Sequence, residues 1–157
     1  MEPGARSLVL GPGEGTTLDL GPFTMSLKAD SALTGGAFSF LEAAEPPHFG
    51  PPMHVHDDAA EVFYVLEGEY LVIVEGAEHR CPAGSFVYVA AGFEHGFRVG
   101  DVPSRKLNLY TPAAMVGYFE ELEAAQRSGL PLAEDELVSM ATRYAMRVTG
   151  EVPQGYL

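Results

Sequence analysis

The chain has 157 residues, of which 46% are hydrophobic and 20% charged, so it is the size of one domain and has the composition of a folded one. Its net charge of −13 disfavours nucleic acid as a partner, because so acidic a chain repels phosphate backbones. No apolar run approaches the about 18 residues of a membrane helix, and residues 1–15 lack the pattern of a secretory signal. Cys81 is the only cysteine, which excludes an internal disulfide. We therefore expect a cytoplasmic protein in which Cys81 is structural rather than nucleophilic.

Short strands dominate the first part of the chain, up to about Thr111, because brief apolar runs there alternate with glycine and proline. Turns are expected at Gly68 with Glu69, over residues 75–78, and at Gly92. The expected strands, in chain order, are residues 23–28, 36–42, 61–67, 70–75, 85–91, 94–99 and 105–110. This series of short strands predicts an all-β sandwich or barrel over residues 1–111.

The remaining segment, residues 112–157, changes to helical periodicity. Thr111 has the character of an N-cap and Pro112 that of a first-turn residue, which predicts a helix ending near Gly129. A second helix is expected over residues 133–148, with Leu137, Ala141, Tyr144 and Val148 on one face. We expect both helices to form an extension that packs on the barrel or on a partner subunit.

Four side chains have the types and spacing of a metal site. His54 and His56 are two residues apart, so both imidazoles point to the same face of a strand. A turn through residues 57–60 lets Glu61 open the next strand on that same side, and His95 opens a further strand after the Gly92 turn. Three imidazoles and one carboxylate suit one divalent transition metal ion, namely iron, nickel, manganese, cobalt or zinc. By contrast, His48 in a proline-rich loop and His79 in a hairpin turn are not expected to be ligands.

The spacing of these residues resembles the two motifs of the cupin superfamily. The first motif corresponds to GPPMHVHDDAAEVFYVLEG at residues 50–68, and the second to GSFVYVAAGFEHGFRV at residues 84–99. The chain departs from the usual pattern at Gly50, which is closer than usual to the first histidine, at Ala90 in place of proline, and at Val99 in place of asparagine. None of these departures removes a ligand. The resemblance implies a jelly-roll barrel, the double-stranded β-helix of cupins, with a short C-terminal helical extension.

Most of the chain is similar to small bacterial cupins often labelled quercetin-dioxygenase-like. That resemblance implies a metal-dependent dioxygenase acting on a flavonol-like or other enolisable phenolic molecule, with Glu61 as ligand and proton acceptor. A non-oxidative isomerase, cyclase or lyase and a binding protein without turnover stay open, because fold does not fix function. The side chains of Phe63, Phe97, Phe40 and Tyr110 are candidates for the lining of the pocket or for plain core. The resemblance also implies a homodimer.

Overall fold

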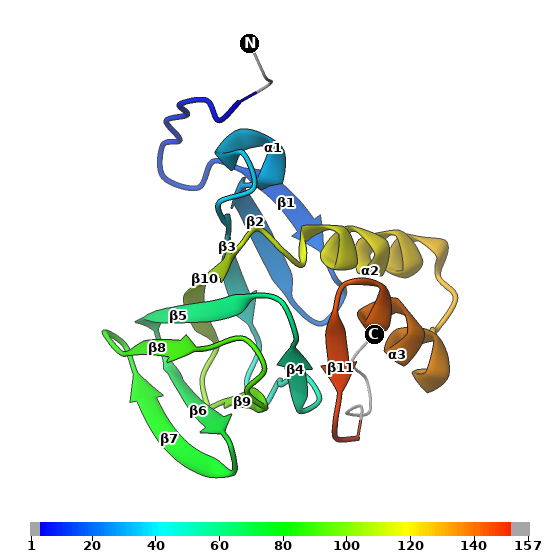
Figure 1. Cartoon of the computed structure of the whole chain (residues 1–157). Coiled ribbons are helices and arrows are strands. Elements are labelled where there is room, and N and C mark those ends of the chain that lie inside the picture. Colours follow the sequence, from blue (N-terminus) through cyan, green and yellow to red (C-terminus); the bar gives the residue numbers. More distant parts are fainter. Residues whose placement is uncertain (1–3, 152–157) are drawn as a thin grey trace.

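The computed structural model describes residues 4–151 and consists of two antiparallel β-sheets with helices against one side (Figure 1). In spatial order, the first sheet contains β1 (Thr16–Asp19), β2 (Thr24–Ala29), β3 (Ser39–Glu45), β10 (Ser104–Thr111), β5 (Ala60–Glu67) and β8 (Phe86–Val89). The second contains β11 (Met146–Val148), β4 (His54–His56), β9 (His95–Val99), β6 (Glu69–Val74) and β7 (Ala77–Pro82). The helices are α1 (Ser31–Thr34), α2 (Val116–Ser128) and α3 (Glu134–Arg143).

Side chains from both sheets meet between them, because alternate residues of each strand face inward. Phe63 and Val65 of β5 pack there with Tyr70 and Val72 of β6 and with Val99 of β9. A second, larger cluster joins β1, β2 and β3 to the helices. This arrangement confirms the predicted fold class, a double-stranded β-helix with a short helical extension, although the open sheet edges at β8 and β7 leave the barrel unclosed.

The turn at Gly68 is confirmed, but the strands on either side of it do not form a hairpin. Instead, β5 belongs to the first sheet and β6 to the second, so Gly68 carries the chain across. Its φ is 74°, and a Cβ at this position would lie 2.0 Å from Ser104 Oγ. Glycine is therefore required here both by backbone conformation and by space.

Two expectations for the tail were wrong. Thr111 is the last residue of β10 rather than a helix N-cap, and α2 begins at Val116 with Met115 in the cap position. The second helix ends at Arg143, and the residues that follow return as β11, which pairs with β4. The reason is long-range: β4 has an open side next to the histidines, and residues 146–148 supply its backbone partners.

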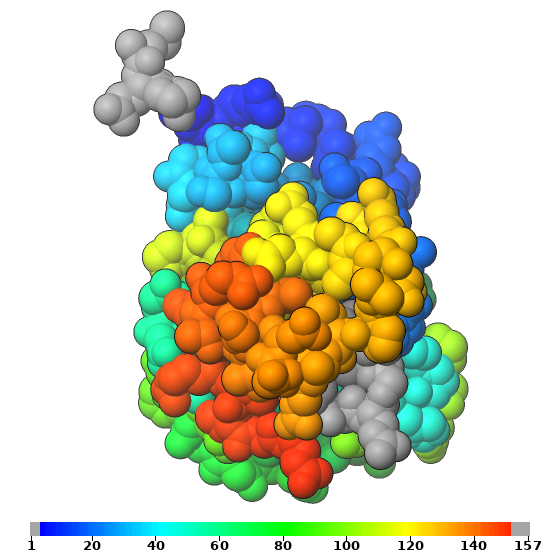
Figure 2. Space-filling model, turned by 90° about the vertical axis from the view of Figure 1, so that its right-hand side faces the viewer, coloured from blue at the N-terminus to red at the C-terminus, as the bar shows by residue number. Residues whose placement is uncertain are grey.

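The helices cover one side of the molecule, and the end of α2 near Gly129 is as predicted. Figure 2 shows α2, α3 and β11, coloured yellow to red, over this face. Leu122 of α2 and Ala141 of α3 are buried in the cluster that contains Leu18 and Leu41 of the first sheet. The division of the chain at residue 111 stays a prediction. Within residues 4–151, no helix has both the length and the apolar character needed to span a bilayer.

Candidate metal centre

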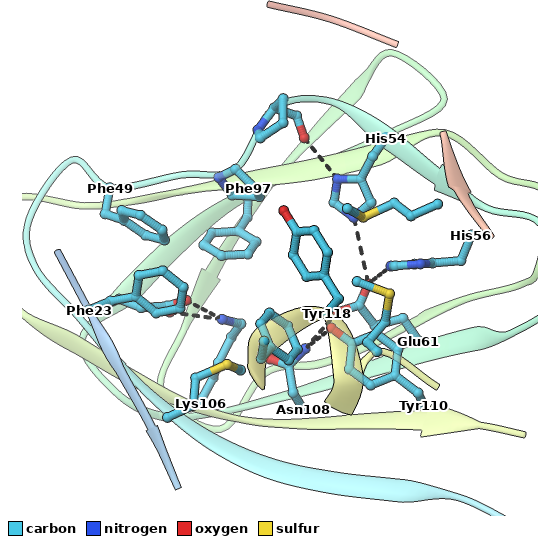
Figure 3. A pocket seen from close by; sticks show the side chains of 17 residues that line it. Phe23, Phe49, His54, His56, Glu61, Phe97, Lys106, Asn108, Tyr110 and Tyr118 are labelled. Carbon is cyan, nitrogen blue, oxygen red and sulfur yellow. Dashed lines mark hydrogen bonds and ion pairs between the residues drawn. The ribbon is translucent and has the colours of Figure 1, made fainter. Parts of the chain in front are cut away.

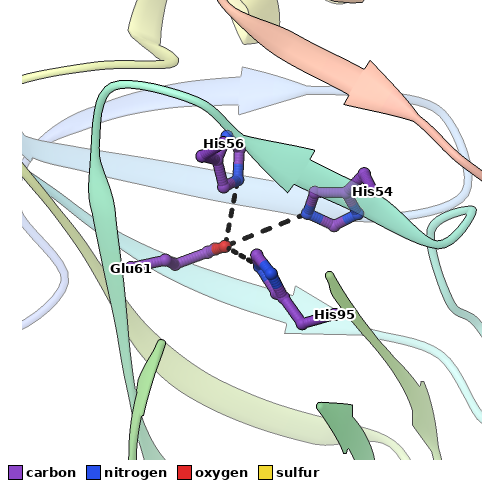
Figure 4. A group of neighbouring side chains, drawn as sticks. All are labelled: His54, His56, Glu61 and His95. Atoms are coloured by element: carbon purple, nitrogen blue, oxygen red, sulfur yellow. Dashed lines mark hydrogen bonds and ion pairs between the residues drawn. The ribbon is translucent and has the colours of Figure 1, made fainter. Parts of the chain in front are cut away.

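The four residues singled out from the sequence come together between the two sheets (Figure 4). His54 and His56 lie on β4, and His54 pairs directly with His95 on the neighbouring strand β9. Glu61 lies on β5 in the other sheet and reaches them because the chain bends at residues 57–58 before β5 begins. The turn expected in this stretch is present. It changes the direction of the chain, so that Glu61 faces His56 although the two residues are an odd number of positions apart.

The imidazoles surround one carboxylate oxygen. Oε2 of Glu61 lies 2.7 Å from Nε2 of His95, 3.1 Å from Nε2 of His56 and 3.9 Å from Nε2 of His54. The four candidate ligand atoms all lie within 4.8 Å of one another, and all four residues are buried. Since metal–nitrogen and metal–oxygen bonds are about 2.0–2.2 Å long, one ion between these atoms can contact them all after small adjustments.

Backbone carbonyls orient two of the imidazoles. Nδ1 of His54 lies 2.8 Å from the carbonyl oxygen of Pro52, and Nδ1 of His95 lies 3.0 Å from that of Phe93. A carbonyl oxygen only accepts, so each Nδ1 carries the proton and donates it. With a metal ion bound and the ring neutral, Nε2 would have the lone pair that faces the ion, whereas an Nε2 that donates a hydrogen bond to Oε2 of Glu61 carries a proton of its own.

Burial and mutual contacts shift the pKa values of the clustered residues. Burial alone would raise the pKa of Glu61, but hydrogen bonds from the three histidines outweigh it and hold that pKa well below its usual range. Burial lowers the pKa of His54, whereas for His95 the contact with Glu61 outweighs burial and raises the pKa. Glu61 is thus held as a carboxylate that faces nitrogen atoms, an environment that fits a divalent cation.

A cavity opens beside this cluster, and Figure 3 shows its lining. Of the four aromatic side chains that were candidates for pocket lining or plain core, Phe97 and Tyr110 line the cavity, whereas Phe63 is plain core and Phe40 is absent from the lining. Four of the lining residues come from the segment that follows β10, namely Met115, Tyr118, Phe119 and Met146. The lining residues that the sequence did not single out are Phe23, Met25, Glu45, Phe49, Pro51, Pro52, Lys106, Asn108, Met115, Tyr118, Phe119 and Met146.

Polar groups on β10 are the main feature that sequence reasoning missed. Lys106 and Asn108 face inward on the same side of the strand as Tyr110, which was already a candidate, and Asn108 donates a hydrogen bond of 2.6 Å to Oε1 of Glu61. Lys106 is buried against Glu45. The signal available was their spacing of two residues along an expected strand, but Leu107 and Leu109 between them offered an equally regular apolar face.

The other two histidines lie away from this centre. His48 is in a loop and faces Asp101 at 3.7 Å, with most of its side chain exposed. His79 is also exposed, but its predicted place in a hairpin turn was wrong, since it lies within β7 and pairs with Val72. The preceding turn is confined to residues 75–76, which allows the strand to begin at Ala77.

Comparisons with known proteins agree with this architecture. Residues 41–110, which include all four clustered residues, match the family model Cupin_2, described as a cupin domain. A segment of 119 residues, 76% of this chain, is 28% identical to quercetin 2,3-dioxygenase of Bacillus subtilis (strain 168). The match spans 35% of that protein, so this chain corresponds to about a third of its curated relative.

Solved structures show the same fold. KdgF from Halomonas sp. matches 68% of this chain and 94% of its own, with a TM-score of 0.61 and 17% identity. The polyketide cyclase RemF from Streptomyces resistomycificus matches 68% of this chain and 80% of its own, with a TM-score of 0.59 and 19% identity. Two antiparallel sheets that enclose a buried histidine and glutamate cluster define a β-sandwich protein with a candidate metal site. Residues 41–110 of this chain match the cupin domain, and the fold of the chain is that of the solved structures above.

Proposed function

We propose that the chain holds one divalent transition metal ion through His54, His56, Glu61 and His95, and that it is a dioxygenase acting on a flavonol-like or other enolisable or phenolic small molecule. The observation that carries the proposal is the convergence of three imidazoles and one carboxylate beside a mainly apolar cavity, which His54, His56 and Glu61 line. The similarity to a quercetin 2,3-dioxygenase supports the oxidative reaction.

The residues around the cavity have different roles in the proposed reaction. A bound ion would act as a Lewis acid that favours the deprotonated form of a substrate hydroxyl. Phe97, Phe49 and Phe23 offer aromatic surface for the substrate and exclude water from it. Glu61 is close enough to the centre to take a proton from the substrate as well as to coordinate, because Oε1 and Oε2 face different partners.

A non-oxidative isomerase, cyclase or lyase is the second candidate, and one observation favours it. Glu45 is a second buried carboxylate that lines the same cavity, so the chain holds a base that is not part of the four-residue cluster. Such a base can move a proton on a substrate without any oxygen chemistry.

The deciding experiment combines elemental analysis of the purified protein with oxygen consumption on a panel of phenols and enols. We expect close to one transition metal per chain and oxygen uptake that depends on one substrate of the panel. Product formation without oxygen uptake would favour the second candidate. A protein that stays metal-free after incubation with iron, nickel, manganese, cobalt or zinc would reject both metal-dependent functions.

A further inference from the structure

One polar side chain that lines the cavity, that of Asn108, has a buried atom without a hydrogen-bond partner. Asn108 has an exposed fraction of 2% and lines the cavity next to Glu61. Its Nδ2 donates to Oε1 of Glu61 at 2.6 Å and to the hydroxyl of Tyr110 at 3.2 Å, as drawn in Figure 3. Its Oδ1 is buried and has no hydrogen-bond partner, which among the described residues holds for only one other side-chain atom, Oγ of Ser26. Ser26 does not line the cavity.

The orientation of the Asn108 amide is fixed by its neighbour. Exchanging the nitrogen and oxygen would place Oδ1 2.6 Å from a carboxylate oxygen, and two acceptors at that distance repel. The atom without a partner is therefore an acceptor. A buried acceptor that stays unpaired is costly, and such atoms in folded proteins are normally paired with water or a ligand.

We propose that Oδ1 of Asn108 accepts a hydrogen bond from the substrate, from a hydroxyl that stays protonated beside the oxygen directed at the four-residue cluster. This inference rests on the proposed function. The two substrate oxygens must be close together, because a single amide group separates Oδ1 from the Glu61 carboxylate. The substrate class is thus a phenol or enol with a second hydroxyl on the adjacent carbon.

The size of the cavity narrows this class to a single ring. Its volume is about 50 Å³, well below the roughly 150 Å³ of an engineered cavity that binds benzene. Met25, Met115 and Met146 are part of the lining, and methionine side chains are flexible enough to make room for one ring. A three-ring flavonol requires a much larger displacement of Phe23, Tyr118 and the other aromatic walls.

A binding cycle tests the hydrogen bond without turnover. Wild type and Asn108→Leu, both incubated with zinc, are titrated calorimetrically with catechol and with phenol. Asn108→Leu also removes the support for Glu61, and catechol can touch the ion with both oxygens. The loss of support for Glu61 affects the binding of both probes, and contact of both catechol oxygens with the ion is possible in both proteins. Both effects therefore cancel when the catechol-to-phenol affinity ratio of wild type is divided by that of the variant. We expect the preference for catechol over phenol to be about ten-fold larger in wild type than in the variant.

The outcomes are separable from those of the proposed function. A catechol preference that is equal in the two proteins overturns the inference even if the protein consumes oxygen, and so does a wild type that binds no catechol. A ten-fold coupling with no oxygen uptake on any phenol supports the inference and rejects the dioxygenase. If Asn108→Leu does not hold zinc, Asn108→Ala, which fits without a clash, takes its place in the same cycle.

Discussion

Lys106 and Glu45 form an ion pair in the interior of the protein, with Nζ of Lys106 2.8 Å from both carboxylate oxygens. The two side chains are 3% and 2% exposed and come from the adjacent strands β10 and β3. The hydroxyl of Tyr70 donates to the same carboxylate at 2.7 Å, and the centroid of the Phe97 ring lies 4.0 Å from Nζ of Lys106. Both residues of the pair line the cavity, as do His54, His56 and Glu61.

Breaking this pair is expected to destabilise the fold strongly. Lys106→Met leaves Glu45 buried without its counter-charge, which lowers the free energy of unfolding by about 3–5 kcal/mol. The double variant Lys106→Met with Glu45→Leu leaves no buried charge and recovers most of that loss. Urea denaturation measures all three proteins. The control is Arg127→Met, since the Arg127 side chain is 74% exposed and lies 3.0 Å from Glu123 within α2, so its loss should cost less than about 1 kcal/mol. A double variant as unstable as Lys106→Met contradicts this account.

Metal content should distinguish two histidines on strands of the same sheet. His56→Ala removes a buried imidazole whose Nε2 faces Glu61 at 3.1 Å, so its metal affinity should fall by orders of magnitude. His79→Ala changes an exposed residue of β7 and should leave metal content intact and stability within about 0.5 kcal/mol. Elemental analysis of both purified variants gives the answer, and equal metal content in the two would refute the ligand assignment.

Glu61→Gln should damage activity more than metal binding. Glutamine keeps a carbonyl oxygen of similar reach, but it holds no negative charge and accepts no proton, so turnover should fall by about 100-fold or more at saturating metal. The measurement is steady-state turnover on the substrate found by the oxygen screen, with metal content recorded in parallel. Recovery of near wild-type turnover on adding metal would leave Glu61 as a structural ligand only.

The crossing between the sheets at Gly68 should tolerate no side chain. Gly68→Ala places a Cβ 2.0 Å from Ser104 Oγ, whereas Gly76→Ala has a similar φ of 79° and meets nothing within 4 Å. Both variants strain the backbone alike, so their difference in unfolding free energy isolates the clash, which we expect to cost about 1–3 kcal/mol more at Gly68. Chemical denaturation of both variants measures this difference. Equal losses would show that the neighbouring β10 segment moves aside freely.

The homodimer stays a prediction. β8 is the edge strand of the first sheet, and its outer residues Phe86 and Tyr88 are 65% and 58% exposed, beside Tyr64 of β5. A second copy of the chain would cover this edge and its aromatic surface. Light scattering at micromolar concentration should give twice the chain mass, and Phe86→Glu should reduce it, whereas Leu130→Glu, at an exposed position between α2 and α3, should not. A monomeric wild type rejects the prediction.

Local patterns in the sequence were sufficient for most of the strands and for the four clustered residues, whereas β1, β7 and β11 were not predicted. Side chains two apart share a face of a strand, so His54 and His56 had to point the same way wherever that strand was placed. Glycine at residue 68 marked a change of direction because only glycine adopts its φ without strain. The spacing of His95 from the Gly92 turn likewise followed from short-range chain geometry.

Long-range contacts decided the rest. Residues 146–148 continue a helical pattern, but pairing with β4 makes them a strand, since a backbone partner distant in sequence outweighs a weak helical propensity. In β10, alternation alone would bury Leu107 and Leu109. Lys106 and Asn108 face inward instead, because there they donate hydrogen bonds to Glu45 and Glu61. The sequence by itself determined which residues can hold a metal, whereas only the tertiary structure decided what surrounds it, because those neighbours come from strands far apart in the chain.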